Sequence, residues 1–238
     1  MLMEFKQTII KKMTEIQTSL KQVLDETKGT TAKLVAVSKY HPVESLREAY
    51  DCGQRVFGES HVQELCMKYD VLPKDIQWHF IGHLQTNKVK YIAPFVSLIH
   101  AVDTMKLLCE INKQAMKHNR VIPCLLQVHI AKEETKFGFT PQELLSFLEE
   151  GEWRHLNNVK ISGIMCMATN TDDEQQIRTE FKIVKQLYDQ VKTQYFNNCD
   201  CFSELSMGMS HDYHIAIQEG STMIRVGSKI FGARNYET

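Results

Sequence analysis

The sequence lacks an excess of charge of either sign. Its 238 residues include 28 lysines and arginines against 29 aspartates and glutamates, a formal net charge of −1 at pH 7. Without a positive field, a protein does not attract nucleic acid backbones or anionic lipid over a distance. Nucleic acids and membrane surfaces are therefore poor candidates for its partners.

The sequence also lacks long apolar runs and a cysteine framework. No run approaches the roughly 18 residues of a membrane span, and the opening MLMEFKQTIIKKMTEIQTSLKQ has no apolar core of a signal peptide. Seven cysteines at scattered positions fit neither a set of disulfides nor paired zinc-ligand spacing. We expect a cytoplasmic protein with reduced thiols, with Cys199 and Cys201 as the one pair close enough to be oxidised.

What the sequence does have is one repeated theme, a short apolar strand followed by an amphipathic helical pattern. The predicted strands are residues 33–38, 55–58, 77–82, 96–102, 122–130, 161–167, 202–207 and 223–227. The predicted helices between them are residues 43–52, 63–69, 104–118, 141–149, 171–195 and 211–219. Eight such units close most simply into an α/β fold of the (β/α)8 TIM-barrel type, and a doubly wound open sheet is the alternative.

The repeat is preceded by a further amphipathic helix. Apolar residues recur every three or four positions from Phe5 to Val23, and Gly29 ends the pattern. No linker or low-complexity tract divides the chain. We therefore expect one domain over residues 1–238, with residues 1–28 as an N-terminal helix packed on the barrel.

The first predicted strand ends in an unexpected residue. Leu34 to Val37 are apolar without interruption, and Ser38 and Lys39 follow. In (β/α)8 barrels the chemistry takes place at the carboxyl ends of the strands, and phosphate groups favour the loops after strands seven and eight. Those loops read LSMGMSHD and MIRVGSKIFGARN, and they supply the candidate residues Ser206, Ser210, Arg225, Gly227 and Ser228.

Closure of the barrel would place strand eight beside strand one, and so Lys39 beside Arg225. A lysine amine, a phosphate cradle and an arginine are the parts needed to hold pyridoxal 5'-phosphate as a Schiff base. Lysine has an ordinary pKa of about 10.4, but desolvation and a cationic neighbour favour the neutral amine that attacks an aldehyde. Each part alone has an ordinary explanation, because strand-end lysines are usually solvated and glycine and serine are common in turns.

Longer segments carry a resemblance to a known family. AVSKYHP, AYDCGQRVFGESHVQEL, WHFIGHLQTNK and ELSMGMSHDYHIAIQEGSTMIRVGSKIFGARNY together resemble the pyridoxal phosphate homeostasis protein family, in order from about residue 34 to 236. The resemblance implies a barrel similar to the N-terminal domain of alanine racemase. It also implies Lys39 as the Schiff-base lysine, Arg225 facing the pyridine nitrogen, and a phosphate site made by Ser206, Ser210, Gly227 and Ser228.

The chain departs from the family pattern at four positions. Ser60 and His129 stand where asparagine is usual, His83 where proline is common, and Ser228 where threonine is frequent. Since Ser228 keeps a hydroxyl, we expect phosphate binding to survive.

The predicted function is binding of pyridoxal phosphate for storage and delivery within the cell, without catalysis. An arginine at the pyridine nitrogen weakens the ring as an electron sink. A racemase needs two opposed proton carriers, and Lys39 is the one convincing candidate. Residue 238 follows the last strand so closely that we expect no C-terminal β domain to supply a second base.

Two alternatives stay open. One is a racemase or lyase of low activity that uses Tyr40, Tyr213 or a histidine as second base. The other is a metal site at His79 and His83 or at His211 and His214, which we disfavour because neither pair has a third ligand at a fixed spacing. For partners, we expect enzymes that require pyridoxal phosphate, and a monomeric protein.

Overall fold

A computed structural model describes residues 13–131, 137–197 and 199–233. Eight parallel strands form a closed barrel in which every strand pairs with the next along the chain and β8 pairs with β1. The strands are β1 (Lys33–Val37), β2 (Val56–Glu59), β3 (Gln77–Phe80), β4 (Leu98–Val102), β5 (Ile122–His129), β6 (Val159–Met167), β7 (Glu204–Ser206) and β8 (Met223–Val226). The (β/α)8 prediction is confirmed, and pairing of the first strand with the last excludes an open sheet.

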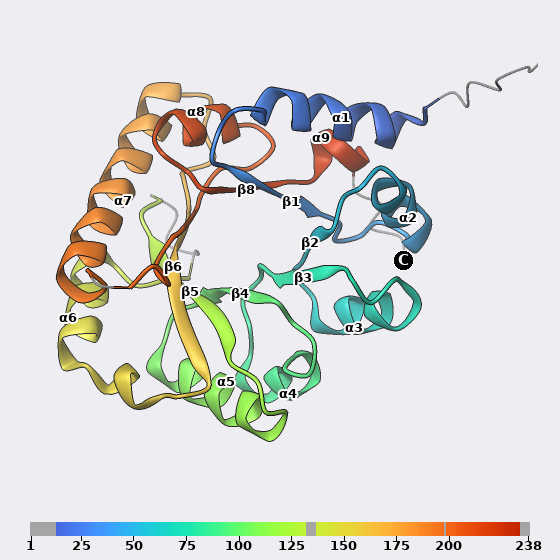
Figure 1. Ribbon diagram of the computed structural model, residues 1–238. Helices are drawn as coiled ribbons and strands as arrows, with labels where there is room; N and C mark the ends of the chain where they lie inside the picture. Colours follow the sequence, from blue (N-terminus) through green and yellow to red (C-terminus); the bar gives the residue numbers. More distant parts are fainter. Residues whose placement is uncertain (1–12, 132–136, 198, 234–238) are drawn as a thin grey trace, which may run out of the picture.

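Helices surround the ring of strands (Figure 1). They are α1 (Glu15–Thr27), α2 (Val43–Asp51), α3 (Val62–Val71), α4 (Val89–Ile92), α5 (Met105–Lys117), α6 (Pro141–Glu150), α7 (Glu174–Tyr195), α8 (Tyr213–Gln218) and α9 (Ser228–Phe231), with short 3-10 turns η1 (Thr86–Lys88) and η2 (Glu152–His155). None of these described helices combines the length and apolar character that a bilayer crossing requires.

The N-terminal helix is confirmed in its described part. Thr14 caps α1 in a capping box with Gln17, and the helix ends at Thr27, just before Gly29 adopts a φ of 83°. The helix packs against α2 and α9 (Figure 1). Residues 1–12, which include the predicted apolar position Phe5, lie outside the described residues.

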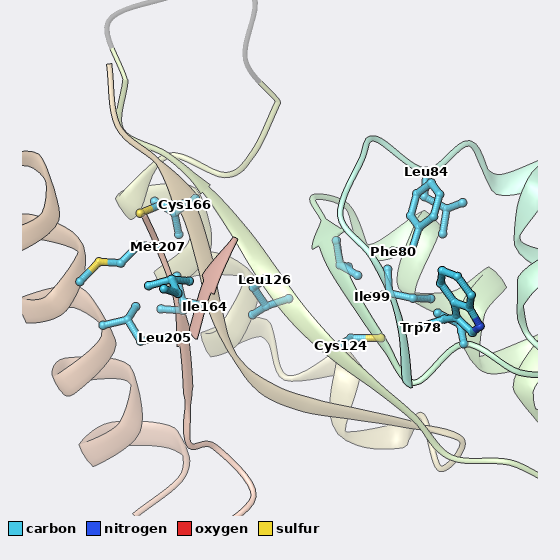
Figure 2. Packing of buried hydrophobic residues seen from close by; sticks show 14 of the residues in the cluster. Trp78, Phe80, Leu84, Ile99, Cys124, Leu126, Ile164, Cys166, Leu205 and Met207 are labelled. Atoms are coloured by element: carbon cyan, nitrogen blue, oxygen red, sulfur yellow. The ribbon is translucent and has the colours of Figure 1, made fainter. Parts of the chain in front are cut away.

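The buried side chains form two clusters because alternate residues of a strand point to opposite sides. The larger cluster fills the layer between strands and helices and includes Trp78, Phe80, Ile99 and Leu126 (Figure 2). The smaller cluster includes Val35, Leu125, Met165 and Met223. Successive strands contribute to both, so the sheet is apolar on its two faces, as the uniformly apolar sequence of β1 indicates.

One sequence expectation was wrong. Cys199 and Cys201 form a disulfide, whereas we expected reduced thiols as the general state. The two cysteines lie in the turn between α7 and β7, where their closeness in sequence brings the sulfur atoms together. The remaining cysteines, Cys52, Cys66, Cys109, Cys124 and Cys166, are free, as expected.

Candidate functional site

A cavity of about 410 Å³ opens at the carboxyl ends of the strands. Five of the six residues that the sequence singles out line it, namely Lys39, Ser210, Arg225, Gly227 and Ser228. Its apolar walls come from three strands or their ends, through Val37, Ile81 and Met167. The structure therefore gathers an amine, a guanidinium, two hydroxyls and a glycine around one space.

Pairing of β1 with β8 produces this gathering. Val35 lies opposite Arg225 in the register of the two strands, and Ala36 lies opposite Val226. Directly beyond them the chains touch, since a Cβ atom placed on Gly227 would lie 2.9 Å from the carbonyl oxygen of Val37. Only glycine allows this approach. The loop after β8 therefore lies against the end of β1, two residues before Lys39.

The loops after β7 and β8 are joined to each other. The Oγ atom of Ser210 accepts a hydrogen bond from the backbone N–H of Gly227, at 3.1 Å, and the N–H of Arg225 donates to the carbonyl of Gly208, at 2.9 Å. Gly208 has a φ of +97°, which favours glycine. Ser228 opens α9, and the first amides of a helix have no partner within the helix. The loops thus present hydroxyl and amide donors to the cavity.

Arg225 is fixed at the base of the cavity. Its side chain is almost completely buried, and it donates from Nη1 to the Oγ atom of Ser206, at 2.7 Å, and from Nη2 to the carbonyl of Cys166, at 2.8 Å. Burial lowers the pKa of the guanidinium, but arginine remains a cation in proteins. The site therefore carries a permanent positive charge in one orientation.

Ser206 is the predicted site residue that the structure places elsewhere. It is fully buried at the end of β7, and it is not among the residues that line the cavity. Its hydroxyl contacts Arg225 and, at 3.1 Å, the Nδ1 atom of His100. A role for Ser206 as a direct phosphate ligand stays a prediction, and its observed contacts are with Arg225 and His100.

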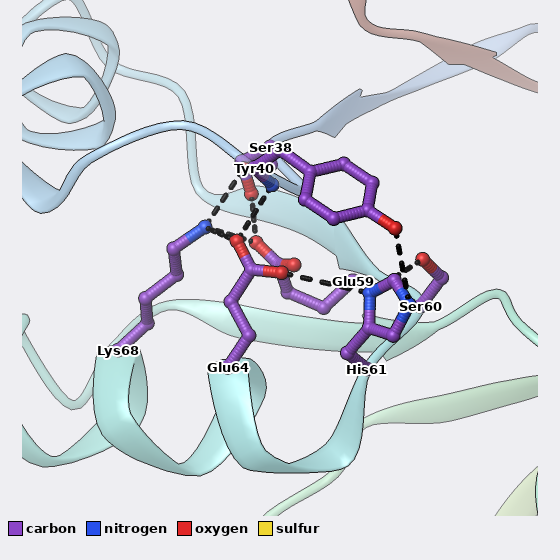
Figure 3. A network of polar contacts seen from close by, with 7 residues as sticks. All are labelled: Ser38, Tyr40, Glu59, Ser60, His61, Glu64 and Lys68. Carbon is purple, nitrogen blue, oxygen red and sulfur yellow. Dashed lines mark hydrogen bonds and ion pairs between the residues drawn. The ribbon is translucent and has the colours of Figure 1, made fainter. Parts of the chain in front are cut away.

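A buried ionic cluster holds the backbone on both sides of Lys39 (Figure 3). The ammonium of Lys68 donates to the carbonyl of Ser38, at 2.7 Å, and to Oε1 of Glu59 and Glu64, at 2.8 and 2.7 Å. The N–H of Tyr40 donates to Oε1 of Glu64, at 2.7 Å. The residues before and after Lys39 are thus tied to one anchor.

This anchor compensates for an uncommon backbone conformation. Tyr40 has a φ of 65°, in the left-handed region that residues other than glycine seldom adopt. Such a conformation persists where the surroundings hold it, and it is frequent at functional sites. We infer that the cluster keeps the chain in the turn that brings Lys39 into the cavity.

The charge balance of the cluster depends on Glu59. Burial raises the pKa of this carboxyl to about 7, although Lys68 and the hydroxyl of Ser38 both oppose the rise. Lys68 is 1% exposed and Glu59 is completely buried. Sequence analysis missed Lys68, since a lysine on an amphipathic helix usually faces solvent. Its spacing of four residues from Glu64 was the available signal.

The tyrosines considered as a second base have other partners. The hydroxyl of Tyr213 donates to Glu26 of α1 and accepts from Lys229, at 2.6 Å. Tyr213 does not line the cavity. The hydrogen bonds from Lys229 and Tyr213 lower the pKa of Glu26 to about 2. The hydroxyl of Tyr40 lies 3.3 Å from Nε2 of His61. The contacts of Tyr213 with Glu26 and Lys229, in contrast, give Tyr213 a role in docking α1.

The histidine pairs considered for a metal are also engaged. Nδ1 of His79 contacts His100, Nδ1 of His83 lies 3.5 Å from Asp103, and Nε2 of His214 lies 3.4 Å from Glu26. In the part of the chain that the structure describes, no three histidine, cysteine, aspartate or glutamate side chains group as a metal would require.

Comparison with known proteins shows to which family the chain belongs. The family model of the alanine racemase N-terminal domain matches residues 13–235. The chain is 43% identical to the pyridoxal phosphate homeostasis protein of Aquifex aeolicus over 206 residues, which cover 86% of this chain and 88% of the relative. It is 36% identical to the protein of that name from Schizosaccharomyces pombe over 219 residues, 91% of this chain and 90% of the relative. The chain belongs to the pyridoxal phosphate homeostasis protein family.

Solved structures agree with this assignment. PipY of Synechococcus elongatus, in a structure with pyridoxal phosphate bound, is similar with a TM-score of 0.82 at 33% identity, over 91% of this chain and all of that chain. Alanine racemase of Bartonella henselae is similar with a TM-score of 0.65 at 16% identity, over 94% of this chain and 61% of that chain. The second likeness shows a shared fold alone.

Three of the four departures from the pyridoxal phosphate homeostasis protein pattern, Ser60, His83 and His129, are not among the residues that line the cavity. Ser60 packs closely on Gly82, where a Cβ atom would lie 2.6 Å from the Ser60 carbonyl, and its hydroxyl lies 3.4 Å from Nδ1 of His61. The ring of His83 stacks on Phe137, with centroids 4.0 Å apart. His129 ends β5, and its N–H donates to the carbonyl of Phe139. The fourth departure, Ser228, lines the cavity.

Proposed function

We propose that this protein binds pyridoxal 5'-phosphate in the cavity at the carboxyl ends of the strands, with the cofactor joined to Lys39 as a Schiff base. The observation that carries the proposal is that one cavity is lined by Lys39, Arg225, Ser210 and Ser228, which come from opposite ends of the chain. The similarity to PipY, which has been solved with pyridoxal phosphate bound, supports the choice of cofactor.

The donors around the cavity match the groups of this cofactor. Ser210 and Ser228 supply hydroxyls for a phosphate, and the opening of α9 supplies backbone amides. Gly227, whose own N–H donates to Ser210, lets the backbone lie close to the bound group. Arg225 supplies a hydrogen-bond donor and a fixed charge for the ring nitrogen. When bound, pyridoxal phosphate supplies an aldehyde that reacts with amines and a ring that withdraws electrons. Lys39 supplies the amine, and its condensation with the aldehyde would release one water molecule.

We further propose that the protein stores and delivers the cofactor rather than catalysing a reaction with it. A guanidinium donates a hydrogen bond but does not give up its proton, so Arg225 favours an unprotonated ring nitrogen. The Tyr213 hydroxyl is held by Glu26 and Lys229 outside the cavity lining. In this proposal the protein is a monomer with one domain over residues 1–238. It delivers the cofactor to enzymes that require pyridoxal phosphate.

Absorption spectroscopy tests the binding proposal. Purified protein incubated with pyridoxal phosphate and desalted should keep a visible absorbance band, and K39A should lose it. Lys106 is exposed and lies on α5, away from the cavity lining, so K106A is the matched control and should keep the band. A band of equal intensity in K39A would overturn the role of Lys39, and its absence from the wild type would overturn cofactor binding.

Proton exchange tests whether the protein is a carrier. A carrier that holds the cofactor on Lys39 without a second base should not exchange the α-proton of amino acids for deuterium. A panel of amino acids in deuterated solvent, followed by mass spectrometry, measures this directly. Exchange above that of free pyridoxal phosphate would support the racemase or lyase alternative instead.

A further inference from the structure

Two histidines that the proposed function does not use lie in the centre of the barrel. His79 of β3 is 6% exposed and His100 of β4 is completely buried. Nδ1 of His79 lies 3.0 Å from Nε2 of His100, and Nδ1 of His100 lies 3.1 Å from Oγ of Ser206. Because Ser206 also accepts from Arg225, a continuous line of hydrogen bonds crosses the barrel interior from β8 to β3.

The directions of these hydrogen bonds follow from the donor at one end. Arg225 only donates, so the oxygen of Ser206 accepts from it. The hydroxyl proton of Ser206 then has one partner in the described part of the chain, Nδ1 of His100, which must be the acceptor. A neutral His100 therefore carries its proton on Nε2 and donates it to Nδ1 of His79. His79 in turn carries its proton on Nε2.

The opposite assignment would leave a buried donor without a partner. If Nδ1 of His100 carried the proton, Ser206 would accept twice and its own O–H would have no recorded acceptor among the described residues. An unpaired buried polar group costs about 1–3 kcal/mol. The first assignment pairs every group along the line except the terminal N–H of His79, for which no partner is recorded among the described residues.

Both rings remain neutral in this environment. Burial, with a smaller contribution from Lys33, lowers the pKa of His79 to about 3. Burial lowers the pKa of His100 well below its ordinary value, and His79 and Arg225 add to the effect. A charged His100 would place a donor on Nδ1 and reverse the hydrogen bond to Ser206. With both rings neutral, all hydrogen bonds of the line run in one direction, from Arg225 through Ser206 and His100 to His79.

The far end of the line reaches a second cavity. His79 lines a space of about 270 Å³ together with Lys33, Gln77, Lys160 and Glu204. These residues lie at or near the amino ends of their strands, so this cavity is opposite the one that holds Lys39. The last N–H of the line, on Nε2 of His79, therefore has a space to face.

We propose that Ser206, His100 and His79 form a directed hydrogen-bond chain that positions the Arg225 guanidinium for the cofactor's ring nitrogen. The inference rests on the proposed function for the identity of the cofactor. The hydrogen bonds of the chain itself do not depend on that function. Charge-assisted hydrogen bonds are stronger than neutral ones, and neighbouring bonds in a chain polarise one another. Removal of His100 should therefore loosen Arg225 without touching the cavity lining. Ser206 and both histidines are positioning residues in this arrangement.

Nuclear magnetic resonance of the protein without cofactor tests the chain itself. Nitrogen-15 spectra of the histidine side chains should show protonated Nε2 and unprotonated Nδ1 for both His79 and His100, unchanged between about pH 5.5 and 8.5. A proton on Nδ1 of His100, or titration of either ring in this range, would overturn the assignment. His118, which is exposed, serves as an internal reference for a histidine in contact with solvent.

Substitutions test the link to the cofactor site. H100F should weaken binding of pyridoxal phosphate about fivefold to tenfold and shift the absorbance band of the bound cofactor. H100N keeps an acceptor toward Ser206 and should restore much of both properties. H118F is the matched control and should behave as wild type. Equal affinity and an unchanged band in H100F, or no rescue by H100N, would overturn the positioning role.

The two experiments separate the two proposals. If the wild type does not bind pyridoxal phosphate, the proposed function fails, and the histidine spectra still uphold or overturn the directed chain. If the wild type binds the cofactor but the spectra show the opposite tautomers, the chain fails and the proposed function stands. Since the wild-type spectra do not depend on any variant, they decide the tautomers of the chain even if H100F fails to fold.

Discussion

Lys68→Met is the substitution that the buried cluster makes most informative. Methionine keeps much of the length and volume of the side chain but removes its charge. The ammonium of Lys68 contacts Glu59, Glu64 and the carbonyl of Ser38, all within 2.8 Å. Without it, two carboxylates face each other beside the turn that carries Lys39. We expect lower stability and weaker cofactor binding together.

The expected magnitude follows from burial. Removing one member of a buried ion pair costs about 3–5 kcal/mol, because the other charge is left without compensation. Glu59 limits this cost by taking up a proton, since its pKa is already raised to about 7 and the loss of Lys68 raises it further. We therefore expect a loss of about 3–5 kcal/mol near pH 8 and a smaller one near pH 5.5.

The pH dependence of the wild type has the same origin. A carboxyl whose pKa is raised on folding stabilises the protein most below its unfolded pKa, and this contribution is lost as the pH rises through the folded pKa. For Glu59, this window runs from the ordinary value of 4.5 to about 7. In the same experiments, the wild type should lose part of its stability across this window.

Urea unfolding measures these effects. Midpoints and slopes for the wild type, K68M and the surface control K106M at the two pH values give the differences in unfolding free energy. A loss below about 1 kcal/mol near pH 8, or a larger loss near pH 5.5, would refute the argument that the cluster is a compensated buried pair.

Three further predictions concern other parts of the site. E26Q should lower the melting temperature near neutral pH. This difference from the wild type should shrink as the pH falls from about 4.5 toward 2, because the pKa of Glu26 is lowered to about 2 and its stabilisation is lost on protonation. A difference that stays constant with pH would contradict this. G227A should destabilise by about 1–3 kcal/mol in urea unfolding and weaken cofactor binding, because its Cβ would lie 2.9 Å from the Val37 carbonyl; wild-type behaviour would show that the strand ends are not in contact. In a double-mutant cycle on cofactor affinity, S206A and H100F should be less than additive, whereas additive losses would favour Ser206 as an independent phosphate ligand.

The sequence determined the barrel because the signals for it are local. The apolar run of β1 and the strand–helix alternation identified all eight strands to within a few residues, and the confirmed closure placed β1 beside β8. The short helix α4 was not predicted as a separate element, since four residues are too few to show helical periodicity. The position of Lys39 at the end of β1 was predictable for the same local reason.

The interior polar groups were not predictable in this way. His79 and His100 are 21 positions apart and meet through pairing across β3 and β4. Lys68 is buried because α3 packs its carboxyl-terminal half against the ends of β1 and β2, which no pattern within α3 indicates. Ser206 fell at the end of the predicted strand 202–207 and was assigned to the phosphate site, but its side chain is buried against Arg225 and His100. Such contacts depend on three-dimensional neighbours.

Borohydride reduction followed by peptide mapping tests the central claim most directly. Reduction of protein loaded with pyridoxal phosphate fixes the cofactor on the amine that holds it. Trypsin should then leave a single peptide, LVAVSKYHPVESLR, uncleaved after Lys39 and heavier by one phosphopyridoxyl group. The account predicts this label on Lys39 as the main product, and a main label on any other lysine, or none at all, would contradict it.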